Sequence, residues 1–186
     1  LKKVRFWCAA RTHKGEELLC IKTHKNLIKK YRNLKTIIIP RHINRCNEIK
    51  SKCIKNNINT QILEANNLID LKSEIIIINS FGQLPKYFSL SKSIFMGKSL
   101  LKNLEAVGGQ NPIEAALLGC KIYHGPYVYN FKEIYDLLKV NKITEEIKDE
   151  KELSKKLLGD LRKNKYKIKK ITKKIKKLGD KILALS

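Results

Sequence analysis

The sequence contains a series of short apolar runs, each followed by polar residues and then by a segment with helical spacing. Ile75–Ile78 consists of four isoleucines, and Val4–Ala10, Thr36–Ile39 and Ser93–Met96 are equally short and rich in β-forming residues. Such a run without polar alternation is typical of a strand that is buried on both faces. Strands that alternate with helices predict an α/β fold, a parallel sheet with helices on both faces.

Turn residues and helical spacing predict where the other strands and the helices begin and end. Glycine, proline and asparagine interrupt the apolar runs, and acidic residues precede lysines in the helical segments. His24 falls within the first of these helices, and we expect it on the helix surface. Further strands are predicted at 58–63 and 121–123, and helices over 16–31, 43–56, 84–88, 112–119 and 130–138.

Composition limits the functional classes without selecting one. The chain has 186 residues and a net charge of +23, but the excess is mostly lysine spread along the chain, with no interleaving of arginine and aromatic residues. Five scattered cysteines without metal-ligand spacing predict reduced, buried thiols. We expect no metal and no membrane-spanning segment. The chain begins almost directly on a strand, as expected of a domain cut from a longer protein.

The segment from Gly108 to Glu114 has the pattern of a ligand-binding turn. Two glycines allow a sharp turn close to a ligand, and Asn111 and Pro112 are typical of an N-cap and a first helical residue. The N-terminus of a helix that begins here would attract an anion. Glu114, in the first turn, is suited to accept hydrogen bonds from ligand hydroxyls. An ordinary helix cap is the alternative interpretation.

Other nucleotide-binding motifs are absent. Gly97-Lys98-Ser99 lacks the earlier glycine of a P-loop, and there is no G-x-G-x-x-G fingerprint. Several polar loops instead follow the predicted strands, and the carboxyl ends of parallel strands meet at one edge of a sheet. These loops predict a nucleotide site with Arg41 on the phosphate or base and Glu114 on the ribose. They are residues 11–15, 40–42, 79–83, 108–114 and 125–126.

Six motifs follow one another along the chain. They are Trp7–Glu17, Pro40–His42 with Arg45, Phe81–Leu84, Phe95–Gly97 with Ser99 and Leu100, Gly108–Glu114, and Gly125-Pro126 with Asn130 and Phe131. In sequence and in order they resemble the motifs of the 3-deoxy-D-manno-octulosonic acid (Kdo) transferases, the lipid A glycosyltransferases. The resemblance is to the C-terminal half of that family and covers about residues 4 to 135.

The resemblance implies the C-terminal half of a GT-B glycosyltransferase, a Rossmann-like domain that binds the donor CMP-Kdo for transfer of Kdo to a lipid A precursor. It implies no metal and no cofactor other than the donor substrate. The catalytic base and the acceptor site are expected in an N-terminal domain absent from this chain, at the cytoplasmic face of the inner membrane. We therefore assign no catalytic residue. The nucleotide contacts implied are Pro40, Arg41, Phe81, Gly82, Gln83, Asn111, Pro112, Ile113 and Glu114.

Three departures from the family pattern affect the expected site. Asn79 and Gln83 stand where the family usually has acids, and Lys98 replaces its usual second glycine. The connection Leu101–Val107 is also longer than usual, which predicts a reshaped cleft. We expect the core to span about residues 1–145, the C-terminal helices to span about 146–186, and this part alone to be inactive.

Two other functions remain open. One is a GT-B transferase or epimerase that uses a UDP-sugar. The other is a basic, non-catalytic module that binds RNA or anionic lipid through the amphipathic, lysine-rich helix predicted between Leu161 and Leu185.

Overall fold

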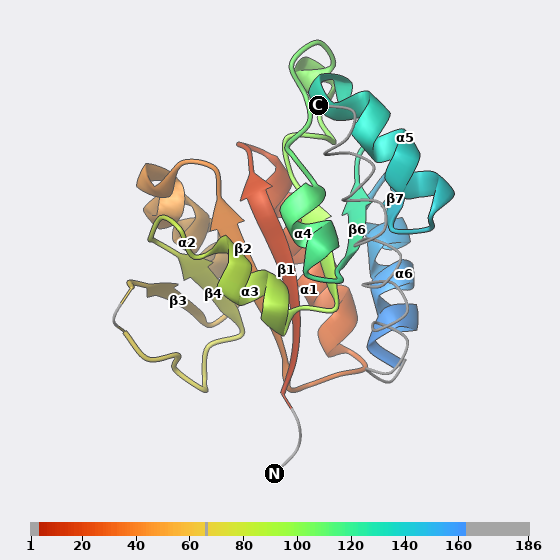
Figure 1. The fold of residues 1–186 in the computed structure, drawn as a ribbon. Coiled ribbons are helices and arrows are strands. Elements are labelled where there is room, and N and C mark those ends of the chain that lie inside the picture. Colours follow the sequence, from red (N-terminus) through yellow and green to blue (C-terminus); the bar gives the residue numbers. More distant parts are fainter. Residues whose placement is uncertain (1–3, 66, 163–186) are drawn as a thin grey trace.

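Seven parallel strands form a single sheet in the order β3-β4-β2-β1-β5-β6-β7. The computed structural model describes residues 4–65 and 67–162. In Figure 1 the carboxyl end of β1 points to the top. The predicted helix between Leu161 and Leu185 lies outside the described residues beyond Arg162. The strands are β1 (Arg5–Thr12), β2 (Leu34–Pro40), β3 (Thr60–Leu63), β4 (Ile75–Ile78), β5 (Ser93–Met96), β6 (Lys121–His124) and β7 (Thr144–Glu146).

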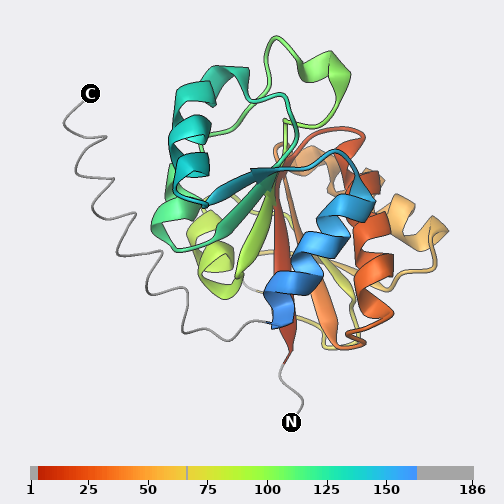
Figure 2. The same cartoon turned by 90° about the vertical axis from the view of Figure 1, so that its right-hand side faces the viewer.

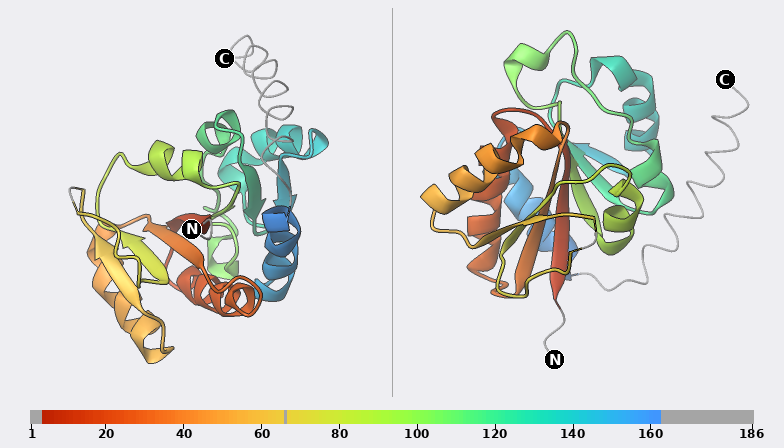
Figure 3. Two further views of the ribbon diagram at one scale, coloured as in Figure 1. Left: turned by 90° about the horizontal axis from the view of Figure 1, so that it is seen from below. Right: turned by 90° about the vertical axis from the view of Figure 1, so that its left-hand side faces the viewer.

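Helices cover both faces of this sheet, so the predicted α/β fold is confirmed. α1, α2 and α6 pack on one face, and α3, α4 and α5 on the other (Figures 1 and 3). Figure 2 shows α6 beside α1 on their shared face. The helices are α1 (Glu16–Ile28), α2 (Cys46–Lys55), α3 (Leu84–Leu90), α4 (Ile113–Leu117), α5 (Lys132–Val140) and α6 (Glu150–Arg162), with short 3-10 turns η1 (Ile43–Arg45), η2 (Lys102–Leu104) and η3 (Tyr129–Phe131).

The alternation of side chains along each strand divides the core into two clusters. In β4, Ile75 and Ile77 face α1, α2 and α6, while Ile76 and Ile78 face α3, α4 and α5. This two-sided burial explains why the run is entirely apolar. β4 lies inside the sheet between β3 and β2, and β1 occupies the middle.

The cysteines and His24 show how deeply the first helix is buried. All five cysteine thiols are buried and unpaired, as the sequence predicts. The surface position predicted for His24 was wrong, because α1 packs against both the sheet and α6. His24 is fully buried and its Nδ1 lies 2.9 Å from the Thr36 hydroxyl.

Candidate functional site

The sheet has its topological switch point between β1 and β5. From β1 the chain continues to β2 on one side, whereas the later strand β5 pairs with β1 on the other. In open α/β sheets, ligands bind in the crevice that forms at the carboxyl ends of such strands. A pocket of about 480 Å³ lies there, a size typical of small-ligand sites. Its lining comprises Arg11, Pro85, Phe88, Met96, Asn111, Ile113, Glu114, Leu117 and Leu118.

Arg11 has an unusual backbone conformation at this point. The register of β1 against β2 shifts between Ala10 and Thr12, and Arg11, between them, has a left-handed φ of 55°. Burial of the guanidinium lowers the pKa of Arg11, and Arg41 lowers it further, whereas Glu114 raises it. Arg11, Arg41 and Glu114 therefore share one electrostatic neighbourhood. Strained residues of this kind concentrate at functional sites.

Pro40 and Arg41 lie where the sequence predicts them, at the carboxyl end of β2. The Arg41 N–H donates to the Thr12 carbonyl at 3.0 Å, which fixes its backbone beside the end of β1. Pro40 is buried, and the Arg41 side chain is exposed. Of this pair, Arg41 is therefore the residue with a side chain available to a ligand.

The segment 108–114 reaches the pocket, and the backbone of Gly109 agrees with the sharp turn that the sequence predicts. A Cβ on Gly108 would lie 2.3 Å from the Tyr127 carbonyl oxygen, and Gly109 has a φ of 99°. These glycines therefore allow close packing against the chain after β6. Asn111 accepts a hydrogen bond from the Ile113 N–H at 2.9 Å.

The helix that follows is shorter than predicted. α4 contains five residues and begins at Ile113, one position after Pro112. A helix this short carries a small dipole, so the predicted attraction of an anion to its N-terminus is weak. Pro112 is buried, while Asn111, Ile113 and Glu114 line the pocket and supply polar atoms and apolar surface.

Phe81, Gly82 and Gln83 form the turn between β4 and α3. Phe81 is 75% exposed and Gly82 has a φ of 73°, with open space where a Cβ would be. None of the three lines the pocket, although Pro85 and Phe88 of the helix that they precede do. The structure therefore brings Asn111, Ile113 and Glu114 together with Arg11, and leaves the 81–83 turn at the margin.

Buried carboxylates hold the loops of this edge in place, and sequence reasoning did not assign them this function. Glu16 accepts backbone N–H groups of His13, Lys98, Ser99 and Leu100 at 2.9, 2.7, 2.9 and 3.1 Å. Burial raises the pKa of Glu16, and these N–H donors oppose that shift. The carboxylate thus joins the loop after β5 to the start of α1.

Glu17 has a comparable anchoring contact. Its two carboxylate oxygens accept from Arg45 Nη1 at 2.6 Å and from Nη2 at 3.1 Å, and the Glu17 side chain is fully buried. This bidentate pair ties α1 to the turn after β2. Glu16 and Arg45 both belong to the sequence motifs, but each also has a distant partner: Lys98 lies 82 positions from Glu16, and Glu17 lies 28 positions from Arg45.

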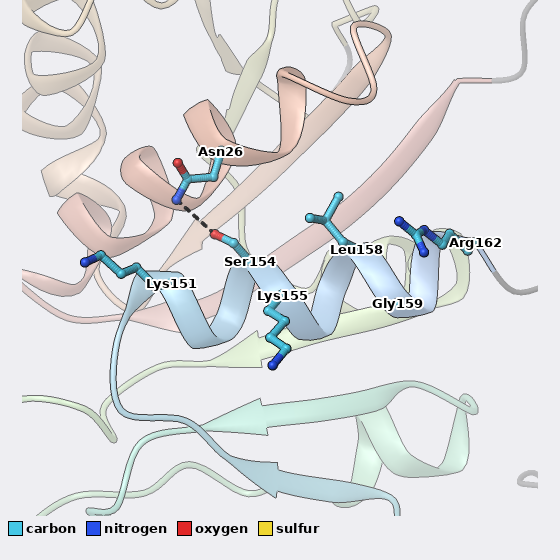
Figure 4. Close-up of a pocket in the computed structure, with 7 residues that line it drawn as sticks. All are labelled: Asn26, Lys151, Ser154, Lys155, Leu158, Gly159 and Arg162. Carbon is cyan, nitrogen blue, oxygen red and sulfur yellow. Dashed lines mark hydrogen bonds between the residues drawn. The ribbon is translucent and has the colours of Figure 1, made fainter.

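Besides a pocket beside Lys25 and Ile28 of α1, two other pockets lie away from this site. One is a groove between α1 and α6 with Lys151, Lys155 and Arg162 on its rim and an Asn26–Ser154 hydrogen bond of 3.2 Å across it (Figure 4). The other, lined by His124 and Tyr129 among others, follows β6. Neither is at the switch point, so neither is the leading candidate.

Residues 4–65 and 67–162 hold neither a metal-ligand cluster nor a membrane-spanning helix. Within that part of the chain, no three His, Cys, Asp or Glu side chains are grouped as metal ligands. None of its helices combines the length and the apolar composition needed to span a bilayer.

Comparison with known proteins gives both sequence relatives and a structural match. No protein-family model matches the chain. It is 33% identical over 132 residues to the 3-deoxy-D-manno-octulosonic acid transferase of Haemophilus influenzae, which covers 71% of this chain and 30% of that protein. It is 28% identical over 155 residues to the transferase of the same name from Aquifex aeolicus, covering 83% of this chain and 41% of that protein.

The fold is also that of a solved domain. The C-terminal CMP-Kdo binding domain of WaaA from Acinetobacter baumannii matches with a TM-score of 0.81 at 23% sequence identity, over 95% of this chain and 89% of that one. The chain thus spans between 30% and 41% of the length of the two sequence relatives, and it corresponds in fold to one domain.

Proposed function

Since this chain belongs to the Kdo transferase family, we propose that it is the donor-binding domain of such an enzyme and binds CMP-Kdo at the switch-point pocket. The observation that carries the proposal is that Arg11 and Glu114 line one pocket at the carboxyl end of β1, with Arg41 within electrostatic reach of Arg11. A bound nucleotide needs cations near its phosphate and hydrogen-bond acceptors near its ribose hydroxyls. The two arginines supply the cations, and Glu114 supplies the acceptor.

The site residues follow from this geometry. Glu114 accepts hydrogen bonds from the ribose hydroxyls, and Asn111 and Ile113 form the adjoining wall of the pocket. Arg41 and Arg11 face the phosphate. Phe81, Gly82 and Gln83 contact the base from the margin, where the exposed ring of Phe81 offers a stacking surface. Pro40 and Pro112, both buried, hold the backbone on either side.

The chemistry that this site supports is departure of CMP. Transfer of Kdo breaks the bond between its anomeric carbon and the phosphate oxygen, and negative charge accumulates on the leaving CMP. Preorganised cations near that charge lower the barrier more than they favour the bound donor. We place Arg11 and Arg41 in this role, and no metal is needed for it.

The remaining functions belong to a second domain. We infer that the acceptor, a lipid A precursor, and the catalytic base are held by an N-terminal domain across a GT-B cleft, at the cytoplasmic face of the inner membrane. The carboxyl edge of the sheet carries the pocket and would face that cleft. The 186-residue chain alone is therefore expected to bind the donor nucleotide without transferring the sugar.

The test is a titration of the chain with CMP, followed by amide NMR shifts, with UMP as the base control. CMP has about 21 non-hydrogen atoms, which at roughly 0.3 kcal/mol each sets a limit near tens of micromolar, and a half-site should bind more weakly. We expect shifts at Arg41, Gly82 and residues 111–114. Glu114→Ala and Arg41→Ala should each weaken binding about tenfold or more, since each removes a hydrogen bond to or from a charged group.

Matched controls distinguish site effects from general charge effects. Glu133→Ala removes an exposed acid from α5, and Arg32→Ala removes an exposed cation at the opposite edge of the sheet. Neither should change CMP affinity. Equal binding of UMP would favour a UDP-sugar enzyme. Strongly salt-dependent binding without nucleotide preference would favour a basic RNA- or lipid-binding module.

A further inference from the structure

The loop after β5 places a lysine in a strained position beside the proposed phosphate site. Lys98 has a left-handed φ of 57°, a conformation unusual for a residue other than glycine. Its N–H donates to the Glu16 carboxylate at 2.7 Å and its carbonyl accepts from the Gly109 N–H at 2.6 Å. Both backbone groups are therefore bonded, and they hold the strained conformation in place.

This loop is pressed against the end of β1. The Gly97 N–H donates to the Ala10 carbonyl at 2.8 Å, and a Cβ on Gly97 would lie 2.6 Å from the Cα of Thr12 and 2.7 Å from the Arg11 carbonyl oxygen. Lys98 thus follows a residue in direct backbone contact with the Arg11–Thr12 bulge. Its half-buried side chain starts at the switch point itself.

Other basic side chains gather at the same place. The rings of His13 and His42 lie edge to face with their centroids 5.9 Å apart. Burial lowers the pKa of His13, and the Lys98 and His42 charges lower it further, which places all three side chains within electrostatic reach. Within residues 4–65 and 67–162, none of Arg11, His13, Arg41, His42 and Lys98 takes part in an ion pair.

The number of cations exceeds what a phosphodiester requires. A sugar nucleotide of the CMP type carries one negative charge on its phosphodiester, which Arg11 and Arg41 can balance. Lys98 is then the remaining cation, since the lowered pKa of His13 leaves that ring neutral at pH 8.

The nearby Glu16 and Glu17 carboxylates do not pair with the Lys98 ammonium, because Glu16 accepts from four backbone N–H groups and Glu17 is bound by Arg45. An acid sugar supplies a counter-charge for Lys98, because its carboxylate is attached to the same anomeric carbon as the phosphodiester oxygen and must lie close to it.

We propose that Lys98, flanked by His13 and His42, forms a second anion subsite that binds the carboxylate of the donor sugar. The proposal rests on the proposed donor function and assigns to Lys98 an additional donor contact in this chain, at a position where the family usually has glycine. A lysine ammonium makes a charge-assisted hydrogen bond with a carboxylate, and its rigidly bonded backbone fixes where that ammonium can reach. The histidines add donors when they are protonated.

The experiment compares CMP with CMP-Kdo by calorimetric titration of the 186-residue chain at pH 8. Both ligands carry about two negative charges there, since the second pKa of a phosphate monoester is about 6, so general electrostatic attraction cancels. We expect CMP-Kdo to bind the parent chain more tightly. Lys98→Gly should weaken CMP-Kdo about tenfold and CMP by less than about twofold.

Lys142→Gly is the matched control. Lys142 has a φ of 59°, nearly the same as Lys98. It lies between α5 and β7, before the amino end of that strand and away from the proposed site. It should change neither affinity. Lys98→Gln, which keeps the backbone strain and removes the charge, should reproduce the effect of Lys98→Gly. Melting curves establish that all three variants fold.

The other possible results of these titrations each contradict part of the proposal. Equal losses for CMP and CMP-Kdo in Lys98→Gly would overturn the carboxylate assignment and place Lys98 on the phosphate. Unchanged affinities, or an equal loss of CMP-Kdo affinity in Lys142→Gly, would overturn it altogether. If neither ligand binds the parent chain, or if binding ignores Arg41→Ala and Glu114→Ala, the proposed donor function itself fails.

Discussion

The loops at the carboxyl ends of the strands carry two sets of charged side chains. The sets differ in whether their charged groups are hydrogen bonded within the protein. The anchored set consists of Glu16, Glu17 and Arg45, whose charged groups are buried or nearly so and are held by short hydrogen bonds. The open set consists of Arg11, Arg41, His42, Lys98 and Glu114, none of which takes part in an ion pair among the described residues.

The difference separates scaffold from site. A buried charge without partners is costly, so the anchored set must be fully bonded for the chain to fold. An exposed charge costs little when unpaired and remains free to bind a ligand. The anchored residues therefore fix the loops, and the open residues project from loops that are already rigid. Mutations in the two sets should have opposite effects on stability and binding.

The largest expected effect follows from Glu16. Glu16→Gln places an amide, with one oxygen acceptor instead of two, among N–H donors from residues 13 and 98–100. We expect the free energy of unfolding in urea to fall by about 4 kcal/mol, since buried N–H groups would lose their acceptor. Glu114→Gln, in the open set, should change it by less than about 0.5 kcal/mol. Similar losses in both variants would break the comparison.

Arg45 provides the next test. Arg45→Ala leaves the buried Glu17 carboxylate with one remaining donor among the described residues, the Gly15 N–H at 3.2 Å. The free energy of unfolding should fall by about 3 kcal/mol, as for other buried ion pairs that lose one partner. Glu48→Ala removes the more exposed acid that also contacts Arg45, at 3.3 Å, and should cost under about 1 kcal/mol. An Arg45→Ala cost no larger than that of Glu48→Ala would remove Glu17 from the anchored set.

The sequence predicts the scaffold better than the anchored contacts. Apolar runs such as Ile75–Ile78 specify buried strands, and the position of Arg41 at a strand end follows from where Pro40 ends the run. The three residues of β7, Thr144–Glu146, were missed because an edge strand of polar residues has no apolar pattern. The acceptor function of Glu16 depends on N–H groups more than 80 positions away, which no local pattern contains.

The burial of α1 and the backbone conformation of Arg11 also could not be predicted from local sequence patterns. α1 is covered by the sheet and by α6, so polar residues such as His24 are buried without forming a recognisable face. The bulge at Arg11 results from strand register, which is a tertiary property. The roles proposed for the site residues remain predictions, because geometry brings some of them together without showing what they bind.

The buried His24 and the exposed His42 allow the same comparison between two histidines. The expected effect on stability is smaller than that of Glu16→Gln. Burial lowers the pKa of His24 to about 4, below its ordinary value near 6.5, so the folded state holds it neutral. The unfolded chain binds the proton first as pH falls, and the stability present above pH 6.5 is lost between pH 6.5 and 4. We expect a loss of about 3 kcal/mol from this residue by pH 4.

Unfolding measured in urea from pH 7 to pH 4 checks this. His24→Gln should flatten the decline by about that amount, whereas His42→Gln, from the exposed ring of the open set, should leave the slope unchanged. An equal slope in the parent chain and His24→Gln would show that His24 titrates alike in the folded and unfolded states.

The smallest effect decides to which set Lys98 belongs. Lys98 and Lys142 both have left-handed backbones, at φ of 57° and 59°. Replacing either with glycine removes a strain of about 1 kcal/mol, while the greater freedom of glycine in the unfolded chain offsets about half of it. Each variant should therefore gain about 0.5 kcal/mol in the free energy of unfolding. If Lys98→Gly gains as much as Lys142→Gly, the Lys98 side chain contributes nothing to the fold and is available for a ligand. If Lys98→Gly instead loses stability, its ammonium has a structural partner, and Lys98 moves from the open set to the anchored one.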